Sequence, residues 1–333
     1  MPLDIVVPDL LPAPDAPPAM RSVRLPNLER WLARANHSVM DTGGSHGWIA
    51  AAHGLVNPLP YAAICLAGEG IDTPGEWIRA DPVHLRVEGD DVVLHDPSVL
   101  ELTTGEAAAL VAALREHFAP DGLEWQPVSP ERWYVRVPAG ESPTTVPLEL
   151  AFGRNVFGML PRGHGRINWP SALTESQMTL SAHAVNLKRA STNLAANSVW
   201  FWGEGPRPAP LERRYEAVHA TDAFSLGIAR LSGAEAHALP AGIEEIAAAS
   251  GGGASLVIVE SLTRWLRRGD ALAWLAATVD LDGRWFDDLG AAIARHGVVR
   301  IILPGEERTR IATLTSSSRW RWFRGRKAIV EHA

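Results

Sequence analysis

Three polar side chains follow one another at helical spacing near the middle of the chain. His183, Asn186 and Arg189 recur every third residue, so on a helix they share one face. Together they can bind a small anion, because arginine offers a planar fork that suits carboxylate or phosphate. The alternative is structural: Arg189 pairs with a carboxylate such as that of Glu204, and the face is an internal tie between the two lobes of the chain.

An aromatic run follows this face after a short polar turn. Residues 195–205 read AANSVWFWGEG, with three aromatic side chains followed by two glycines. This pattern predicts a buried strand that ends in a tight turn. Beside the polar face, such a strand would supply the apolar wall of a ligand site.

The pattern His-x-x-Asn-x-x-Arg, followed by Ala-Asn-Ser-x-Trp-x-Trp-Gly-x-Gly, resembles the archaeal-type cofactor-independent phosphoglycerate mutases of the alkaline phosphatase superfamily. It is more similar still to short bacterial relatives with regulatory or mutase-like roles. Further matching pieces are WIRADPVHLR at 77–86, ERWY at 131–134 and MLPRG at 159–163. The resemblance implies an α/β fold of alkaline-phosphatase-like type, with a mainly parallel sheet and a smaller inserted α+β domain.

The resemblance also draws attention to two positions in the first part of the chain. The first strand of the superfamily ends in a metal-binding aspartate, so Asp9 is a candidate metal ligand, with a turn-forming aspartate as the alternative. Ser45 lies near the family's nucleophile, and its flanking glycines permit a sharp turn. His46 stands where the family usually has an aspartate. For residues 41–47 we favour a flexible polar loop.

The other metal ligands of the superfamily have no counterpart in this sequence. Two divalent cations need Asp and His ligands from several strand ends. After the apolar run 254–259 the chain has Glu260, three arginines and no histidine, and after the last apolar run it has Glu306 and Glu307 instead of an Asp-His pair. Asp9 and Glu260 alone cannot supply the set. We therefore expect no dinuclear metal site and no bound cofactor.

Both ends of the chain have the sequence pattern of an α/β domain, and the middle part has that of an α+β domain. Strands are predicted at 3–7, 92–94, 133–137, 254–259 and 297–303. One helix is predicted to begin at Pro26. A second is predicted over 105–118, with Thr103 or Thr104 as its N-cap and Glu106 in its first turn. The last two strands should form a parallel pair with a right-handed crossover. We expect a discontinuous α/β lobe of residues 1–75 and 198–333, with 76–197 as the inserted α+β domain. Residues 3–7 should then pair within 254–303.

Composition limits the classes of protein to be considered. With 46% hydrophobic and 21% charged residues, a chain of 333 residues can bury an ordinary core. The net charge of -7 argues against general nucleic-acid binding. No apolar run is long enough to span a bilayer, and the N-terminus lacks the form of a signal peptide, so a cytoplasmic protein is expected. The single cysteine, Cys65, excludes an intrachain disulfide and predicts a buried thiol.

Basic and aromatic side chains alternate in the segment SRWRWFRGRK at 318–327. Such alternation can stack on bases or lie at an anionic membrane. It is also the ordinary pattern of an edge strand, with aromatics inward and arginines solvated, and this is our prediction.

Two functions follow from these observations. The first is a catalytically degenerate mutase-like pseudoenzyme that binds a small phosphorylated or carboxylate-bearing anion, or a protein partner, in a regulatory role. The second is an active metal-dependent mutase or phosphoester hydrolase with a rearranged site, which would use Mn or Zn. We favour the first, because function has to be argued from the site and the ligand set is deficient.

Overall fold

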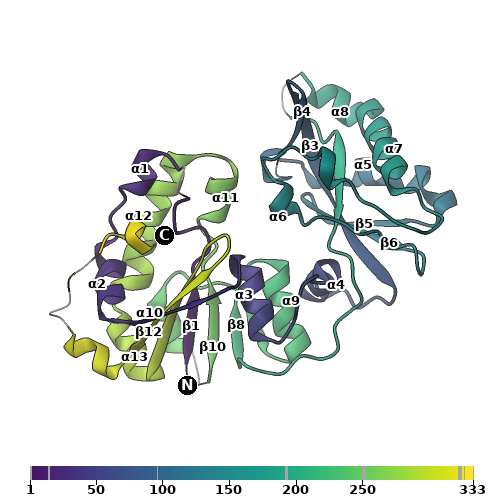
Figure 1. Cartoon of the computed structure of the whole chain (residues 1–333). Helices are drawn as coiled ribbons and strands as arrows, with labels where there is room; N and C mark the ends of the chain where they lie inside the picture. The colour runs from purple at the N-terminus through teal and green to yellow at the C-terminus, as the bar shows by residue number, and fades with distance from the viewer. Residues whose placement is uncertain are drawn as a thin grey trace. The chain divides into compact units, whose positions relative to one another are not determined.

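Each of the two units of the chain has its own β-sheet (Figure 1). The computed structural model describes residues 2–13, 16–95, 97–191, 194–249, 253–321, 325 and 327–332. Unit 1 comprises Met1–Val56 and Pro210–Ala333, and unit 2 comprises Asn57–Ala209. We expected the boundaries at 75/76 and 197/198. The units divide at 56/57 and 209/210 instead, because the helix before residue 75 and the strand after residue 197 both pack on the longest strand of unit 2.

The sheet of unit 1 has seven strands, in the order β2-β12-β11-β1-β10-β8-β9. They are β1 (Leu3–Val6), β2 (Asn36–Met40), β8 (Ala217–His219), β9 (Glu235–His237), β10 (Ser255–Ile258), β11 (Val298–Pro304) and β12 (Thr309–Thr315). All neighbours are parallel except those of β12, which runs antiparallel to both β11 and β2. The mainly parallel sheet is therefore confirmed.

Strand β1 is the centre of this sheet. All four of its residues are buried, and Ile5 faces Val257 on one side and Ile301 on the other. The predicted pairing of residues 3–7 within 254–303 is thus confirmed. The expected direct pair between β10 and β11 is wrong, because β1 lies between them. Apolar runs show that both strands are buried, but their order depends on contacts far apart in the sequence.

Helices cover both faces of this sheet. The helices of unit 1 are α1 (Pro18–Arg21), α2 (Pro26–Arg34), α3 (Gly44–Ala52), α9 (Ala223–Ser232), α10 (Ile243–Ala249), α11 (Thr263–Arg267), α12 (Ala271–Phe286) and α13 (Leu289–His296), with 3₁₀ turns at Ser316–Trp320 and Ile329–His332. Helices α2, α10, α12 and α13 share one apolar core with the strands, and α3 and α9 lie on the other side (Figure 1). As predicted, α2 opens at Pro26, and the Asp282 carboxylate accepts hydrogen bonds from the first amides of α2.

Unit 2 is an antiparallel sheet with helices packed against it. Its strands are β3 (Glu76–Glu88), β4 (Asp91–His95), β5 (Glu124–Ser129), β6 (Arg132–Val137) and β7 (Ser198–Trp202). Its helices are α4 (Tyr61–Gly68), α5 (Thr104–His117), α6 (Leu148–Ala151), α7 (Trp169–Ala182) and α8 (Ala184–Arg189), with 3₁₀ turns at Pro97–Val99, Ala119–Asp121 and Phe157–Met159. Strand β3 pairs with β4, β6 and β7 in turn. The strand and helix predictions for this unit are confirmed, including the cap of α5 by Thr103 with Glu106.

The beginning of the basic and aromatic segment does not form the predicted strand. Residues 316–320 are a 3₁₀ turn, and the Trp320 side chain is 78% exposed rather than docked inward. The Arg321 guanidinium is not simply solvated, because it donates to the backbone oxygen of Arg34 and to Asn36 Oδ1. Residues 322–324 and 326 lie outside the described residues.

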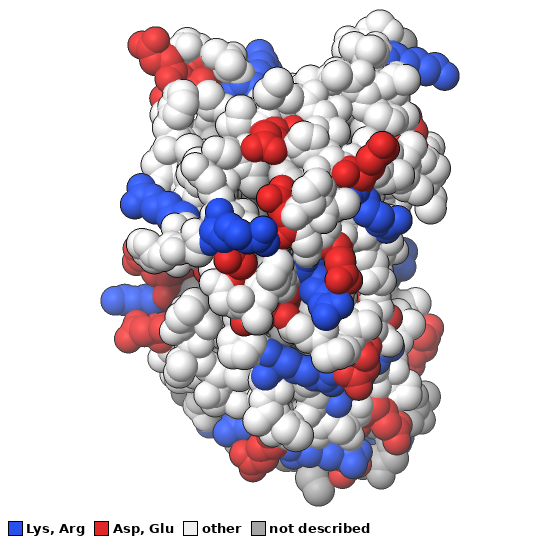
Figure 2. All heavy atoms as spheres, turned by 90° about the vertical axis from the view of Figure 1, so that its right-hand side faces the viewer, with Lys and Arg blue, Asp and Glu red and all other residues white. Residues whose placement is uncertain are grey.

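The single cysteine lies in the interior, and charges of both signs lie on the surface. Cys65 is buried in α4, as predicted. Figure 2 shows acidic and basic side chains interspersed over one face, with no broad patch of a single sign among the described residues of that face. None of the helices in the described part of the chain combines the length and apolar character that crossing a bilayer requires.

Candidate functional site

Three neighbouring strands of unit 1 end at the same edge of the sheet. Strands β1, β10 and β8 are adjacent and parallel, so the residues that follow them are brought to one edge. Asp9 follows β1, Glu260 follows β10 and Asp222 follows β8. Helix α3 packs against α9, which brings His46 to this edge as well.

His46, Asp222 and Glu260 meet there in what we call the edge cluster. One nitrogen or oxygen atom of each side chain lies within 4.8 Å of the others. His46 Nε2 is 3.2 Å from Asp222 Oδ1, and the imidazole stacks on the Phe224 ring with 4.5 Å between ring centroids. An imidazole and two carboxylates this close can hold a divalent cation or share a proton.

Neighbouring groups hold the two carboxylates of the edge cluster in position. Asp222 is the N-cap of α9, where its Oδ1 accepts a hydrogen bond of 2.7 Å from the Ser225 amide. Thr221 Oγ1 donates to Glu260 Oε2 over 3.1 Å. The arrangement is therefore fixed by the first turn of α9 and by the loop before it.

The two carboxylates have pKa shifts of opposite direction. Burial, together with the nearby Asp222 carboxylate, raises the pKa of Glu260 to about 8. Burial also opposes the ionisation of Asp222, but hydrogen bonds from His46 and Ser225 outweigh it and lower the pKa of Asp222. Near neutral pH the pair therefore carries a single negative charge, with the proton on Glu260. A group that titrates near neutral pH can give or take a proton in a reaction.

Ser45 lies in the first turn of α3 and directly precedes His46, so the flexible loop expected over 41–47 is wrong for residues 44–47. The start of α3 is held against the turn between β11 and β12, where the Gly44 amide donates to the Gly305 oxygen over 2.9 Å. A side chain at Gly43 would clash with the backbone oxygen of Glu306, so glycine is needed at this close approach.

Asp9 lies in a turn after β1, with a left-handed φ of 58°. Its backbone oxygen accepts a hydrogen bond of 3.0 Å from Trp274 Nε1. Its carboxylate is not among the converging ligand atoms of the described residues. These contacts agree with the turn-forming alternative for Asp9.

Comparisons with known proteins point to one family of enzymes. No family model matches the chain. A stretch of 132 residues is 26% identical to the protein named "Probable 2,3-bisphosphoglycerate-independent phosphoglycerate mutase" of Geobacter sulfurreducens, and covers 39% of this chain and 33% of that one. A stretch of 120 residues is 28% identical to the 2,3-bisphosphoglycerate-independent phosphoglycerate mutase of Methanothrix thermoacetophila, and covers 36% and 30%. The similarity thus spans about a third of each relative.

A solved structure shares the fold. The PH0037 protein from Pyrococcus horikoshii superimposes with a TM-score of 0.52 and 12% identity over 94% of this chain and 87% of that one. For the cofactor-independent phosphoglycerate mutase from Thermoplasma acidophilum the TM-score is 0.46, with 18% identity over 95% and 90%. The chain is homologous to cofactor-independent phosphoglycerate mutases. The predicted resemblance and fold class are thereby confirmed. The closer likeness to short regulatory members stays a prediction.

The segment that first suggested the mutases forms internal contacts in unit 2. His183 is partly exposed, and its Nδ1 caps α8 by accepting a hydrogen bond of 3.3 Å from the Val185 amide. The buried Asn186 side chain donates to the backbone oxygens of Leu180 and Ala196, both at 2.8 Å, and accepts from the Ala196 amide. These two side chains stabilise the junction between α7 and α8 and the segment that leads into β7.

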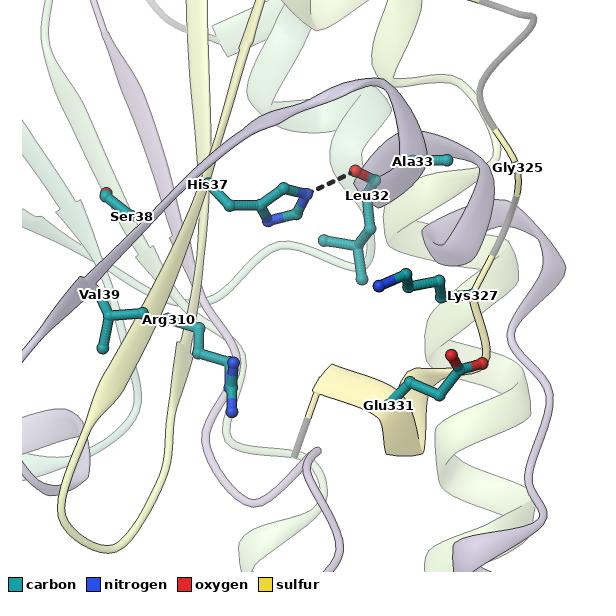
Figure 3. A pocket seen from close by; sticks show the side chains of 9 residues that line it. All are labelled: Leu32, Ala33, His37, Ser38, Val39, Arg310, Gly325, Lys327 and Glu331. Atoms are coloured by element: carbon teal, nitrogen blue, oxygen red, sulfur yellow. Dashed lines mark hydrogen bonds between the residues drawn. The ribbon is translucent and has the colours of Figure 1, made fainter.

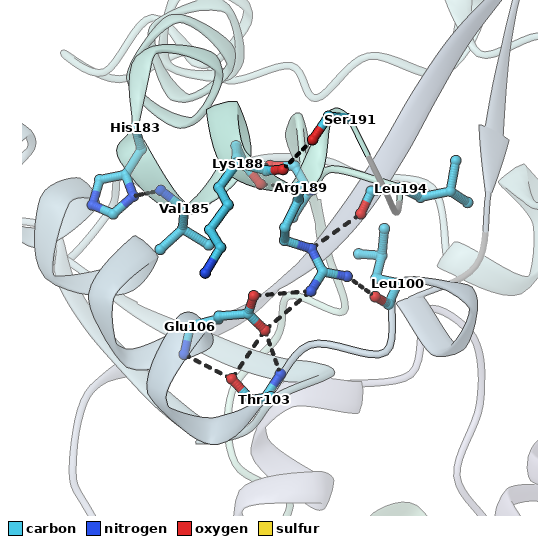
Figure 4. A network of polar contacts seen from close by, with 11 residues as sticks. Leu100, Thr103, Glu106, His183, Val185, Lys188, Arg189, Ser191 and Leu194 are labelled. Atoms are coloured by element: carbon cyan, nitrogen blue, oxygen red, sulfur yellow. Dashed lines mark hydrogen bonds and ion pairs between the residues drawn. The ribbon is translucent and has the colours of Figure 1, made fainter.

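Arg189 is at the centre of the network in Figure 4. Its Nη1 contacts both carboxylate oxygens of Glu106 at 3.0 Å, and its other nitrogens donate to the backbone oxygens of Leu194 and Leu100. The pairing suggested with Glu204 is wrong, because Glu204 accepts hydrogen bonds from Thr145. The contacts of the motif all lie within unit 2, so they tie segments of that unit to one another and not the inserted domain to the main lobe. The ligand site at these residues stays a prediction.

The aromatic strand β7 is buried, as predicted. Trp202 Nε1 donates to Asp81 Oδ2 over 2.7 Å, and the Arg79 guanidinium lies over the Trp202 ring and donates to the same carboxylate. Trp200 Nε1 donates to the Val146 oxygen. The strand therefore completes the core of unit 2.

A pocket of about 330 Å³ lies elsewhere in unit 1, next to β2 and β12 (Figure 3). Its lining consists of Leu32, Ala33, His37, Ser38, Val39, Arg310, Gly325, Lys327 and Glu331. His37 Nε2 lies 2.9 Å from the Leu32 backbone oxygen. Gly325 and Lys327 belong to the basic and aromatic segment 318–327, whereas Asp9, Ser45, His183, Asn186 and Arg189 do not line this pocket.

Sequence reasoning overlooked Asp222 and noted His46 only as a departure from the family pattern. The strand before Asp222 has only three residues, so it gave no apolar run. The available signal was local: an aspartate directly before an apolar helical run is a helix N-cap pattern. That signal identifies a cap but does not reveal its neighbours.

Proposed function

We propose that this mutase homologue is catalytically degenerate and acts as a binding or regulatory protein without a dinuclear metal centre. Phosphoryl transfer between two cations requires two sets of ligands around a common position. In the described part of the chain, one group of three potential ligands converges, the edge cluster. The residues therefore do not fit two cations, and this observation carries the proposal.

The sequence after Glu260 supports the same proposal. Arg264 and Arg267 lie in α11, and Arg268 follows it. The positive charge of Arg267 acts on the Glu260 carboxyl and favours its ionised form. A guanidinium near the edge cluster disfavours a second dication, because the like charges repel in a partly buried site.

For the ligand we propose a small anion that carries a phosphate or a carboxylate. The relatives named above are phosphoglycerate mutases. The arginines of α11 offer forks that suit phosphate and carboxylate oxygens, and they follow the strand that leads to the edge cluster. A protein partner is the alternative occupant, and the experiment below distinguishes the two.

A second candidate is an active enzyme with one Mn or Zn ion. The observation that favours it is the position of Ser45, which directly precedes His46 of the edge cluster in α3. When bound, a cation would polarise a phosphoryl oxygen. Ser45 would then be the nucleophile of a phosphoester hydrolase or a mutase.

The test uses the full chain with Mn²⁺ and, separately, with Zn²⁺. Conversion of phosphoglycerate and hydrolysis of a phosphoester should not exceed the level of a Ser45→Ala variant. Turnover that Ser45→Ala abolishes would support the active enzyme and overturn the proposal.

Binding is tested by thermal melting with phosphoglycerate and with sulfate. A bound anion should raise the melting temperature of the wild type. It should do so less for Arg267→Ala than for Arg284→Ala, a control at an exposed ion pair of α12. If neither anion stabilises the protein, the small-anion ligand is excluded and the protein partner remains.

A further inference from the structure

We propose that the pocket beside β2 and β12 is a binding site for a small phosphate monoester, with Arg310 and Lys327 as the groups that hold the phosphate. Its walls are the end of α2, the two strands and the C-terminal segment, of which residues 321, 325 and 327–332 are described. The inference goes beyond the proposed function, because this pocket is separate from the arginines of α11. It also gives a role to the end of the basic and aromatic segment.

The pocket and the edge cluster lie at different parts of the sheet. Strands β11 and β1 separate β2 and β12 from β10 and β8, which lead to the edge cluster and to α11. Side chains alternate between the faces of a strand, so Arg310 lies on the same face of β12 as Ala312 and Leu314. Those two residues belong to the core shared with α2, whereas α3 and α9, which carry His46 and Asp222, lie on the other side. The pocket is therefore a site of its own.

Cations outnumber carboxylates in the wall of the pocket. Figure 3 shows the Lys327 ammonium pointing into the space that faces Arg310, and the Glu331 carboxylate pointing away from Arg310. Glu331 is the one acidic residue of the described wall, and its Oε1 accepts a hydrogen bond of 2.9 Å from the Ala328 amide. In a chain with a net charge of -7, this local excess of positive charge attracts an anion.

An imidazole and apolar side chains complete the wall. A carbonyl oxygen can only accept, so His37 Nε2 donates to the Leu32 backbone oxygen over 2.9 Å and thereby holds the imidazole between β2 and the end of α2. Leu32 and Val39 add apolar surface. A volume of about 330 Å³ with a few polar groups is at the lower end of the range of ligand pockets. The pocket therefore suits a small organic molecule rather than a polymer.

Contacts on both sides of Lys327 hold the C-terminal segment beside the pocket. Arg321 Nη1 donates to Asn36 Oδ1 over 2.7 Å and to the Arg34 backbone oxygen over 3.3 Å. Ile329 is fully buried in the core that α2 shares. Because Lys327 lies two residues before this anchor, its backbone is fixed at the pocket wall, and little ordering is needed when a ligand binds.

Two cations on different walls favour a dianion over a singly charged anion. The guanidinium fork of Arg310 binds phosphate or carboxylate oxygens at two points, and the Lys327 ammonium adds a further donor as a point charge. A phosphate monoester carries a charge of about −1.5 to −2 near neutral pH and has three acceptor oxygens, whereas a carboxylate has one charge and two oxygens. A phosphate therefore matches the charge of the two side chains and their placement on two walls.

The experiment labels the full chain with pyridoxal 5′-phosphate, a phosphate monoester that carries an aldehyde. The chain has two lysines, Lys188 and Lys327, and both are exposed. The aldehyde condenses with a lysine amine to an imine and water, and borohydride reduces the imine to a stable amine that peptide mass spectrometry locates. Because bound phosphate concentrates the aldehyde beside it, Lys327 should be labelled about fivefold or more over Lys188 at a small excess of reagent.

Controls show whether the phosphate directs the label. Pyridoxal, which lacks the phosphate, should label the two lysines about equally. Inorganic phosphate should protect Lys327 but not Lys188, and acetate at the same concentration should protect Lys327 less. Arg310→Gln should remove the preference, whereas Arg284→Gln, at an exposed ion pair of α12, should keep it. Circular dichroism shows whether Arg310→Gln is folded; if it is not, protection of the wild type by phosphate decides.

Several results would overturn the inference. They are equal labelling of the two lysines, a preference for Lys327 that pyridoxal shares, or a preference that folded Arg310→Gln keeps. Protection by acetate as strong as that by phosphate would also contradict a phosphate site.

Arg267→Ala separates the inference from the proposed function. Labelling of Lys327 should be unchanged in this variant, whereas the anion stabilisation proposed for α11 should decrease. If Arg267→Ala removed the preference for Lys327, the two would be one site and the inference would be wrong. Equal labelling of the lysines in the wild type would leave the proposed function intact.

Discussion

The edge cluster of unit 1 and the Arg189 network of unit 2 are both gathered polar groups, but their charges are balanced differently. Arg189 is almost buried, and its guanidinium meets the Glu106 carboxylate and two backbone oxygens. The edge cluster instead brings two carboxylates together and leaves Asp222 Oδ2 without a partner among the described residues. A buried cation whose charge is matched by a carboxylate stabilises the fold. Neighbouring carboxylates without a matching cation favour the binding of a proton or of an ion from solution. Spacing in the sequence cannot make this distinction.

The largest effect should come from Arg189→Ala. Removing the guanidinium leaves a partly buried carboxylate and two backbone oxygens without their donor, which should lower the free energy of unfolding by about 3 kcal/mol. Unfolding in urea measures the loss. Phosphate and sulfate should not change it, because the network is internal.

Arg86→Ala is the control for this prediction. Arg86 also pairs with a glutamate of unit 2, but both side chains are exposed, at 62% and 45%. Its loss should be below about 0.5 kcal/mol. Equal losses for the two variants, or anion stabilisation that only Arg189→Ala removes, would contradict the internal tie and restore the ligand site.

The next effect is a dependence of the metal-free protein on pH through Glu260. Its pKa is raised from 4.5 to about 8, so the folded state holds the proton more tightly than the unfolded state. The contribution to stability is therefore complete below pH 4.5 and is lost as the pH rises through about 8. We expect a decrease of about 1–3 kcal/mol over this range, measured by urea unfolding, and Glu260→Gln should remove it.

Glu106 of the balanced network should behave in the opposite way. Its backbone hydrogen bond at Thr103 lowers its pKa against the effect of burial, and Arg189 adds to the shift. Its contribution is present above pH 4.5 and is lost as the pH falls below this value.

If the stability of Glu260→Gln kept the pH dependence of the wild type, the assignment to Glu260 would be refuted.

The smallest effect should come from Thr103→Ala, which removes the side-chain cap of α5. The expected loss is about 1 kcal/mol in urea unfolding. Because Thr103 and Arg189 both hold Glu106, the double variant should lose less than the sum of the two single losses. Strict additivity would show that the cap and the ion pair are independent.

Local pattern was sufficient for several elements. The helix predicted over 105–118 is α5 (Thr104–His117), and the aromatic run forms β7 (Ser198–Trp202). Such elements are readable because caps, periodicity and apolar runs act over a few residues. The sequence did not show to which of the two units β7 belongs. Strand β7 pairs with β3, more than a hundred residues earlier in the chain, and therefore lies in unit 2, which ends at 209/210 and not at the expected 197/198.

By itself, the sequence determined the family, the buried central strand and the nature of the side chains that the chain can offer. Only the tertiary structure decided which of them act together. The motif of His183, Asn186 and Arg189 became an internal network because Glu106 and several backbone oxygens surround it. Asp222 meets His46 and Glu260 because parallel strands end at one edge and α3 packs on α9. These contacts join residues far apart in the chain, and no local spacing encodes them.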